Sequence, residues 1–180
     1  MSIYRSIICL AVLGTGYSAS AGVISGSQTF YNMSASSRTY TFYQYAPLSG
    51  GSGGSMMNGS VTATLTDLNG NGALLSTDPA GNAIYTATIN DVAVQTLWNS
   101  PFGLAVGQYL SNSAAPVSFA NVPVPAGVPA DGNVGVVLRF RLSAGDAVSF
   151  AYTFNVVPGP GAVALLACAG CVTNNRRRKN

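Results

Sequence analysis

The residues whose types and spacing best suggest chemistry lie between Asp67 and Asp78. Counting from Asp67, side-chain oxygens fall at positions 1, 3 and 5, glycine at position 6 and a further carboxylate at position 12, namely Asp67, Asn69, Asn71, Gly72 and Asp78. This is the spacing of a calcium loop, in which alternate side chains turn their oxygens toward the ion. However, position 12 lacks the longer Glu, and a proline follows it. A hairpin turn built from two Asn-Gly steps explains the same residues. The sequence favours the turn over calcium, and we assign no metal ligand.

Catalytic motifs are poorly supported. The chain has no histidine, which excludes Ser-His-Asp and Cys-His nucleophilic catalysis and any zinc site that needs imidazole. Residues 50–54 match the G-x-S-x-G pattern of hydrolases without its strand, helix or histidine partner. Cys168 and Cys171 form a C-x-x-C pair inside an apolar tail rather than in a redox βαβ unit. We therefore predict a non-enzymatic protein with no catalytic residue and no cofactor.

Aromatic side chains raise the possibility of glycan binding, because aromatic planes stack on sugar rings. The candidates are Tyr31, Tyr40, Phe42, Tyr43, Tyr45 and Trp98. Aromatic residues in strands also pack in cores and across strands. A glycan-binding face therefore remains an alternative to packing.

The elements that would position these residues are strands. Residues 39–45 are β-branched and aromatic, and residues 60–66 alternate with period two, as expected of half-buried strands. Gly, Pro, Asn and Asp interrupt the pattern every ~8–12 residues, the spacing of a sandwich or barrel. The sequence predicts an all-β fold, an antiparallel β-sandwich of about eight or nine strands over residues 22–155. We expect strands at 29–33, 39–45, 60–66, 83–89, 92–98, 103–110, 116–122, 134–142 and 147–157. A tight turn at 143–146 should join the last two strands, a flexible loop should cover 49–55, and the proline-rich residues 122–131 should form a crossover loop.

Charge is scarce in this body. Charged residues make up 7% of the chain, against about 25% in an ordinary soluble domain. The body holds three arginines, Arg38, Arg139 and Arg141, against five aspartates, a net charge of −2. A nucleic-acid partner requires a basic stripe to displace counterions from phosphates. We therefore expect no nucleic acid as a partner.

Both ends of the chain carry targeting signals. Residues 1–21 have a basic start, an apolar stretch over 7–14 and a small-x-small site at Ala19 and Ala21, the pattern of a signal peptide cleaved by signal peptidase. At the other end, residues 156–180 contain a proline motif (Val157, Pro158, Gly159, Pro160), an apolar run at 161–173 and a basic cluster (Arg176, Arg177, Arg178, Lys179). We predict that the apolar run is a short hydrophobic helix that enters the inner membrane, with the basic cluster retained on the cytoplasmic side.

This tail resembles the PEP-CTERM sorting signal, which consists of a Val-Pro-x-Pro motif, a hydrophobic segment and an arginine cluster. The chain has Gly159 where the family most often has Glu. Its apolar run of about 13 residues spans about 20 Å as a helix, less than the ~30 Å hydrocarbon core. The resemblance implies processing by an exosortase-type transpeptidase, with Val157, Pro158 and Pro160 as the recognition segment and the arginines as the retention charge. Proteins of this type are linked to the cell surface and to extracellular polysaccharide.

The sequence thus predicts an exported surface or matrix protein, anchored transiently in the inner membrane and then sorted to the cell surface or released. Two alternatives stay open. The body could be a calcium- or glycan-binding β-sandwich module, or the chain could be a simple single-pass membrane-anchored protein.

Overall fold

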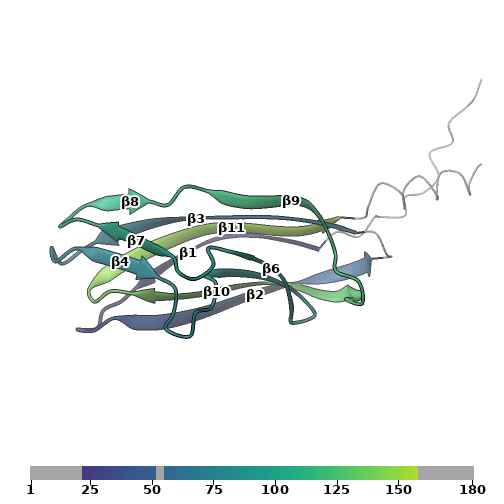
Figure 1. The fold of residues 1–180 in the computed structure, drawn as a ribbon, viewed down its shortest axis with the longest axis horizontal. Helices are drawn as coiled ribbons and strands as arrows, with labels where there is room; N and C mark the ends of the chain where they lie inside the picture. The colour runs from purple at the N-terminus through teal and green to yellow at the C-terminus, as the bar shows by residue number, and fades with distance from the viewer. Residues whose placement is uncertain (1–21, 52–54, 158–180) are drawn as a thin grey trace, which may run out of the picture.

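The computed structural model describes residues 22–51 and 55–157. In this part of the chain eleven strands form two antiparallel sheets and no helix occurs (Figure 1). The predicted all-β sandwich is therefore confirmed. None of the described segments forms a helix that could span a membrane.

Sheet A contains five of the strands. They are β1 (Gly22–Tyr31), β3 (Met56–Asp67), β8 (Ser111–Ser113), β9 (Val117–Pro123) and β11 (Asp146–Val157). β11 lies between β1 and β3, and the far edge of β3 pairs with β8 and β9 in succession. β3, β9 and β11 can be followed in the upper layer of Figure 1.

Sheet B contains the other six. They are β2 (Arg38–Gly51), β4 (Ala73–Ser76), β5 (Tyr85–Ile89), β6 (Val92–Leu97), β7 (Gly103–Val106) and β10 (Ala130–Leu142). One edge of β10 pairs with β2 along nearly its whole length. Its other edge pairs with β5 and then with β4, which extend the sheet to β6 and β7. β2 and β10 form the lower layer of Figure 1.

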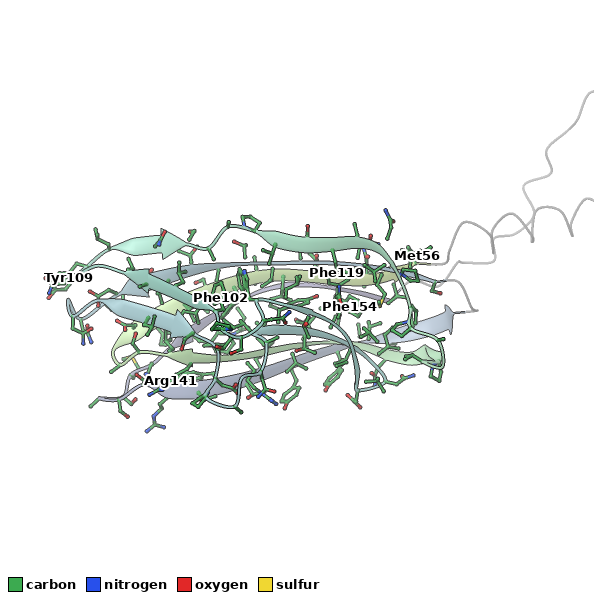
Figure 2. The ribbon with its side chains drawn as sticks, in the orientation of Figure 1. Met56, Phe102, Tyr109, Phe119, Arg141 and Phe154 are labelled. Carbon is green, nitrogen blue, oxygen red and sulfur yellow. The ribbon has the colours of Figure 1, made fainter. Side chains whose placement is uncertain are left out.

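The core lies between the sheets because alternate residues of each strand point inward. In β10 the even-numbered residues from Val134 to Leu142 are fully buried, and in β11 those from Val148 to Val156 are nearly so. Aromatic rings fill the centre: Phe140 of β10 lies 4.9 Å from Phe150 of β11 and 5.0 Å from Phe30 of β1, measured between centroids. Toward the other end Phe119 and Phe154 pack together (Figure 2). The contacts of Phe140 join the two layers, whereas Phe119 and Phe154 both belong to sheet A.

Several connections pass from one sheet to the other. The tight turn after β10 is present, but β10 and β11 belong to different sheets and do not pair as a hairpin. The Asn-Gly turn after β3 likewise leads from sheet A to β4 in sheet B, so the prediction that it closes a hairpin is wrong. The proline-rich segment between β9 and β10 does connect the two sheets, as expected of a crossover loop.

The number of strands exceeds the eight or nine expected. The two unpredicted strands, β4 and β8, have only four and three residues, and β8 reads Ser-Asn-Ser, with no apolar residue to mark it. In addition, β2 continues to Gly51, into the glycine-serine run that predicts a loop. Neighbouring strands supply backbone partners at these positions, and their contribution overrides weak local preference.

Candidate functional site

The segment that starts at Asp67 is a turn organised around its own carboxylate. The Oδ1 atom of Asp67 accepts hydrogen bonds from the backbone N–H groups of Asn69 (3.3 Å) and Gly70 (3.1 Å). Its Oδ2 atom accepts from those of Gly72 (3.2 Å) and Tyr109 (2.7 Å). Four donors converge on one carboxylate that is only 3% exposed. A calcium loop turns oxygens inward, whereas this loop turns N–H groups inward.

The other residues of the calcium pattern have separate partners. Asn69 donates from Nδ2 to the carbonyl of Ala144, and its Oδ1 accepts from the N–H of Asn71. Asp78 accepts hydrogen bonds from the backbone and side-chain nitrogens of Asn82. Among the side chains that the structure describes, no three His, Cys, Asp or Glu residues come close enough to share a metal ion.

Asp67 has a second carboxyl group as its neighbour. Asp146 is its cross-strand partner on β11, is 1% exposed and accepts a hydrogen bond from the hydroxyl of Ser143. Burial and the adjacent Asp67 raise the pKa of Asp146, only partly opposed by Ser143. Burial would also raise the pKa of Asp67, but hydrogen bonds from the Tyr109, Gly72 and Asn69 N–H groups and from Asp146 lower it. The two neighbouring carboxyls therefore differ: the pKa of Asp146 is raised and that of Asp67 is lowered.

Two exposed tyrosines form the most distinctive surface feature. Tyr43 and Tyr45 are 52% and 47% exposed, and their rings lie 6.3 Å apart with an angle of only 9° between their planes. Both belong to β2, in which odd-numbered residues point out of the sandwich. The two rings are therefore nearly parallel on the outer face of sheet B. We call this pair the tyrosine platform.

The strand next to β2 leaves room for one of these rings. Gly135 of β10 stands opposite Tyr45, and Thr88 of β5 stands opposite Gly135 on its other side. A Cβ atom at residue 135 would lie 2.8 Å from Cε1 of Tyr45 and would overlap the Oγ1 atom of Thr88. The absence of a side chain thus allows Tyr45 to lean over β10. The pKa of Tyr45 is raised by burial and by its hydrogen bond with the Asp91 carboxylate, and this bond holds the outer end of the ring.

The remaining aromatic candidates do not join the platform. Tyr40 and Phe42 point inward, where Tyr40 stacks on Phe140 and Phe42 packs against Phe30. Tyr31 is exposed at the end of β1 in sheet A. Trp98 stacks on Phe102 at 4.9 Å, half-buried against the core. Period-two parity in residues 39–45 was the sequence signal that could have separated Tyr43 and Tyr45 from their inward neighbours.

Two arginines share the outer face with the platform. Arg139 and Arg141 of β10 stand opposite Thr41 and Thr39 of β2, and the row continues through Val137 opposite Tyr43. Directly opposite residues of an antiparallel pair lie on the same face. Arg141 is exposed, and in Figure 2 it lies on the outside of the lower layer. Sequence reasoning did not connect these arginines with the tyrosines because β2 and β10 are about ninety residues apart in the chain.

The targeting residues lie almost entirely outside the described part of the chain. Ala19, Ala21, Pro158, Gly159, Pro160, the apolar run at 161–173 and the basic residues 176–179 all belong to segments that the structure does not describe. Only Val157 is described, as the last residue of β11 and the partner of Met56. The signal peptide, the short C-terminal helix and the sorting motif therefore stay predictions.

Comparison with known proteins gives little further information. No family model matches the chain, and no curated protein matches it. Among solved structures, the chain is similar to TmCBM61, determined in complex with β-1,4-galactotriose. That similarity covers 78% of this chain and 84% of the other, with 10% identity and a TM-score of 0.32. At this TM-score the similarity supports no particular site.

Proposed function

We propose that the β-sandwich is a non-catalytic glycan-binding module and that the tyrosine platform is its binding surface. The observation that best supports this proposal is the pair of parallel, half-exposed rings of Tyr43 and Tyr45 on one strand. An aromatic ring presents a rigid apolar face with negative charge density, on which the C–H groups of a sugar ring pack favourably. Two parallel rings on one strand suit contact with successive sugars of a polymer.

The surroundings of the platform support a polymer rather than a small molecule. The rings lie on an open sheet face along β2, and their neighbours Thr41, Val137 and Pro47 are small or medium in size. Small-molecule sites are concave and enclose most of the ligand, whereas this surface is open along the strand direction.

Binding to a panel of polysaccharides tests this proposal. The full chain is titrated by isothermal calorimetry with soluble polysaccharides, both neutral and acidic, and tested in pull-downs with insoluble ones. We expect Tyr43→Ala and Tyr45→Ala each to weaken binding at least fivefold. The estimate is taken from nucleobases stacked on aromatic side chains, where each ring contributes about 1–3 kcal/mol. Tyr31→Ala removes an equally exposed tyrosine from the other sheet and should leave affinity unchanged. If no polysaccharide binds, or if Tyr31→Ala has the same effect as the platform variants, the proposal is wrong.

A second proposal concerns the destination of the module. The ordered tail of Val-Pro-x-Pro motif, apolar run and basic cluster supports export followed by sorting through an exosortase-type transpeptidase, with transient anchoring in the inner membrane. A polysaccharide-binding body is consistent with a final position at the cell surface or in the extracellular matrix. Mass spectrometry of the C-terminus of the surface-located protein tests this. We expect Arg176, Arg177 and Arg178 to be absent from it, and an intact basic cluster would contradict the sorting proposal.

A further inference from the structure

The distribution of charge on the folded surface differs from the net charge of the body. Three aspartates, Asp67, Asp78 and Asp146, are at most 8% exposed and accept internal hydrogen bonds. Among the carboxylates whose side chains the structure describes, Asp91 is the exposed one. The sequence gives the body a net charge of −2, yet most of its described negative charge is withdrawn from solvent.

The positive charges, in contrast, stay accessible and lie close together. Arg38 and Arg141 are exposed and Arg139 is half-buried, and all three belong to the paired ends of β2 and β10. Arg139 lies near enough to Asp78 for its charge to help lower the pKa of that carboxyl, although burial acts in the opposite direction. Arg141 forms no ion pair with any side chain that the structure describes, and its other strand neighbour is the uncharged Ser76. Its guanidinium is thus available to a ligand.

The arginines and the tyrosine platform form one line. On the outer face, the register along β10 runs from Gly135 beneath Tyr45, through Val137 beside Tyr43, to Arg139 and then Arg141. With a rise of about 3.4 Å per residue, the guanidinium-bearing positions begin about 7 Å beyond the ring of Tyr43 and the row extends over about 20 Å. A polymer that lies along the strands on both rings therefore continues directly over Arg139 and Arg141.

We propose that the glycan bound by the platform is an acidic polysaccharide whose uronate carboxylates pair with Arg141 and Arg139. This inference rests on the proposed function and specifies its ligand. Guanidinium groups bind carboxylates through two parallel N–H···O hydrogen bonds. Stacking on the tyrosines supplies affinity for sugar rings in general, and the arginines supply selectivity for charged ones. The carboxylate of Asp91 lies at the Tyr45 end of the row and the arginines lie at the other end. This difference in charge orients an acidic polymer along the row.

The test compares each acidic polysaccharide with its own uncharged form. The full chain is titrated with polygalacturonate and alginate and with the esterified derivative of each, at low and high salt. We expect the acidic forms to bind about tenfold more tightly at low ionic strength, because charge pairs at the exposed Arg141 and the half-buried Arg139 each contribute a few-fold. The preference should disappear at about 1 M salt, where the Debye length is only about 3 Å.

Single substitutions test which residues produce the preference for the acidic form. Arg141→Ala should remove most of the preference for the acidic form while leaving affinity for the esterified form unchanged, and Arg141→Lys should restore part of it. Arg38→Ala is the matched control, since Arg38 lies opposite Leu142 in the inward register and beside Asn32 and Tyr40 at the end of the sandwich. Tyr43→Ala should weaken binding of both forms equally.

The possible results distinguish failure of this inference from failure of the proposed glycan-binding function. Equal binding of acidic and esterified forms overturns the inference and leaves the glycan-binding function intact. Absence of binding to either form overturns both. Binding of an oligodeoxythymidylate with the same affinity and the same dependence on Arg141 would show a nucleic-acid surface and would also overturn the inference.

Discussion

Tyr45 and Gly135 stand directly opposite each other on β2 and β10, and the tyrosine ring occupies space that a side chain at residue 135 would need. Glycine is unfavourable in the interior of a strand, where it costs roughly 0.5–1 kcal/mol relative to alanine. Its presence in the central strand of sheet B is explained by the close approach of two neighbours, Tyr45 on one side and Thr88 on the other. The orientation of the tyrosine platform therefore depends on the glycine opposite Tyr45.

A Gly135→Ala substitution should displace Tyr45. The new methyl group would overlap Thr88 and crowd the tyrosine ring, and overpacking of this kind costs about 1–3 kcal/mol. We expect a lower free energy of unfolding in urea and weaker glycan binding. Gly103→Ala is the control, because a Cβ atom there has no neighbour within 4 Å. Equal stability and affinity in Gly135→Ala and the wild type would contradict the described geometry.

The paired carboxyls Asp67 and Asp146 should make stability depend on pH in opposite ways. The pKa of Asp146 is raised from 3.8 by burial and by Asp67. The stability that Asp146 contributes is therefore fully present below pH 3.8 and is lost as the pH rises through the raised pKa. The pKa of Asp67 is lowered, because hydrogen bonds outweigh burial. Its contribution is present above 3.8 and is lost as pH falls through the lowered pKa.

Asparagine substitutions distinguish the two roles. Asp146→Asn removes a buried ionisable group next to Asp67, so we expect it to be more stable than the wild type at pH 7 and similar near pH 4. Asp67→Asn weakens the hydrogen bonds that this side chain accepts from four backbone N–H groups. It should lower the free energy of unfolding at pH 7 by about 1–3 kcal/mol. Urea unfolding at several pH values measures both. If Asp146→Asn is the more destabilising of the two at pH 7, the raised pKa of Asp146 is contradicted.

Calcium should have no effect on the turn that begins at Asp67. Since both oxygens of Asp67 already accept backbone N–H groups, a cation could bind only after those bonds break. We expect the thermal midpoint of the full chain to be the same in millimolar calcium and in a chelator. A calcium-dependent rise in the midpoint that disappears in Asp67→Ala would show that the loop rearranges into a metal site.

Replacement of Thr88 by valine should stabilise the protein. The Oγ1 atom of Thr88 is buried and has no hydrogen-bond partner within the described part of the chain, and burial of an unsatisfied hydroxyl costs about 1–3 kcal/mol. Thr88→Val replaces this hydroxyl with a methyl group of similar size in a strand that favours β-branched residues. The control is Thr64→Val, which loses a 2.9 Å hydrogen bond to the hydroxyl of Ser113 and should not be stabilised. Loss of stability in Thr88→Val would indicate that its hydroxyl has a bound partner.

Local sequence patterns were enough to predict that this protein is built of strands, where most of them lie, and that the run from Asp67 to Gly72 is a turn. These features are local: period-two alternation, β-branched and aromatic residues, and Asn-Gly steps act over a few neighbouring residues. The three-dimensional arrangement was needed to show that β10 and β11 lie in different sheets, that Gly135 lies opposite Tyr45 and that the arginines continue the line of the platform. It also decided which carboxylates are buried, and therefore which charges a ligand can reach. The reason is that pairing between strands distant in the chain sets the register, and the register determines which side chains share a face.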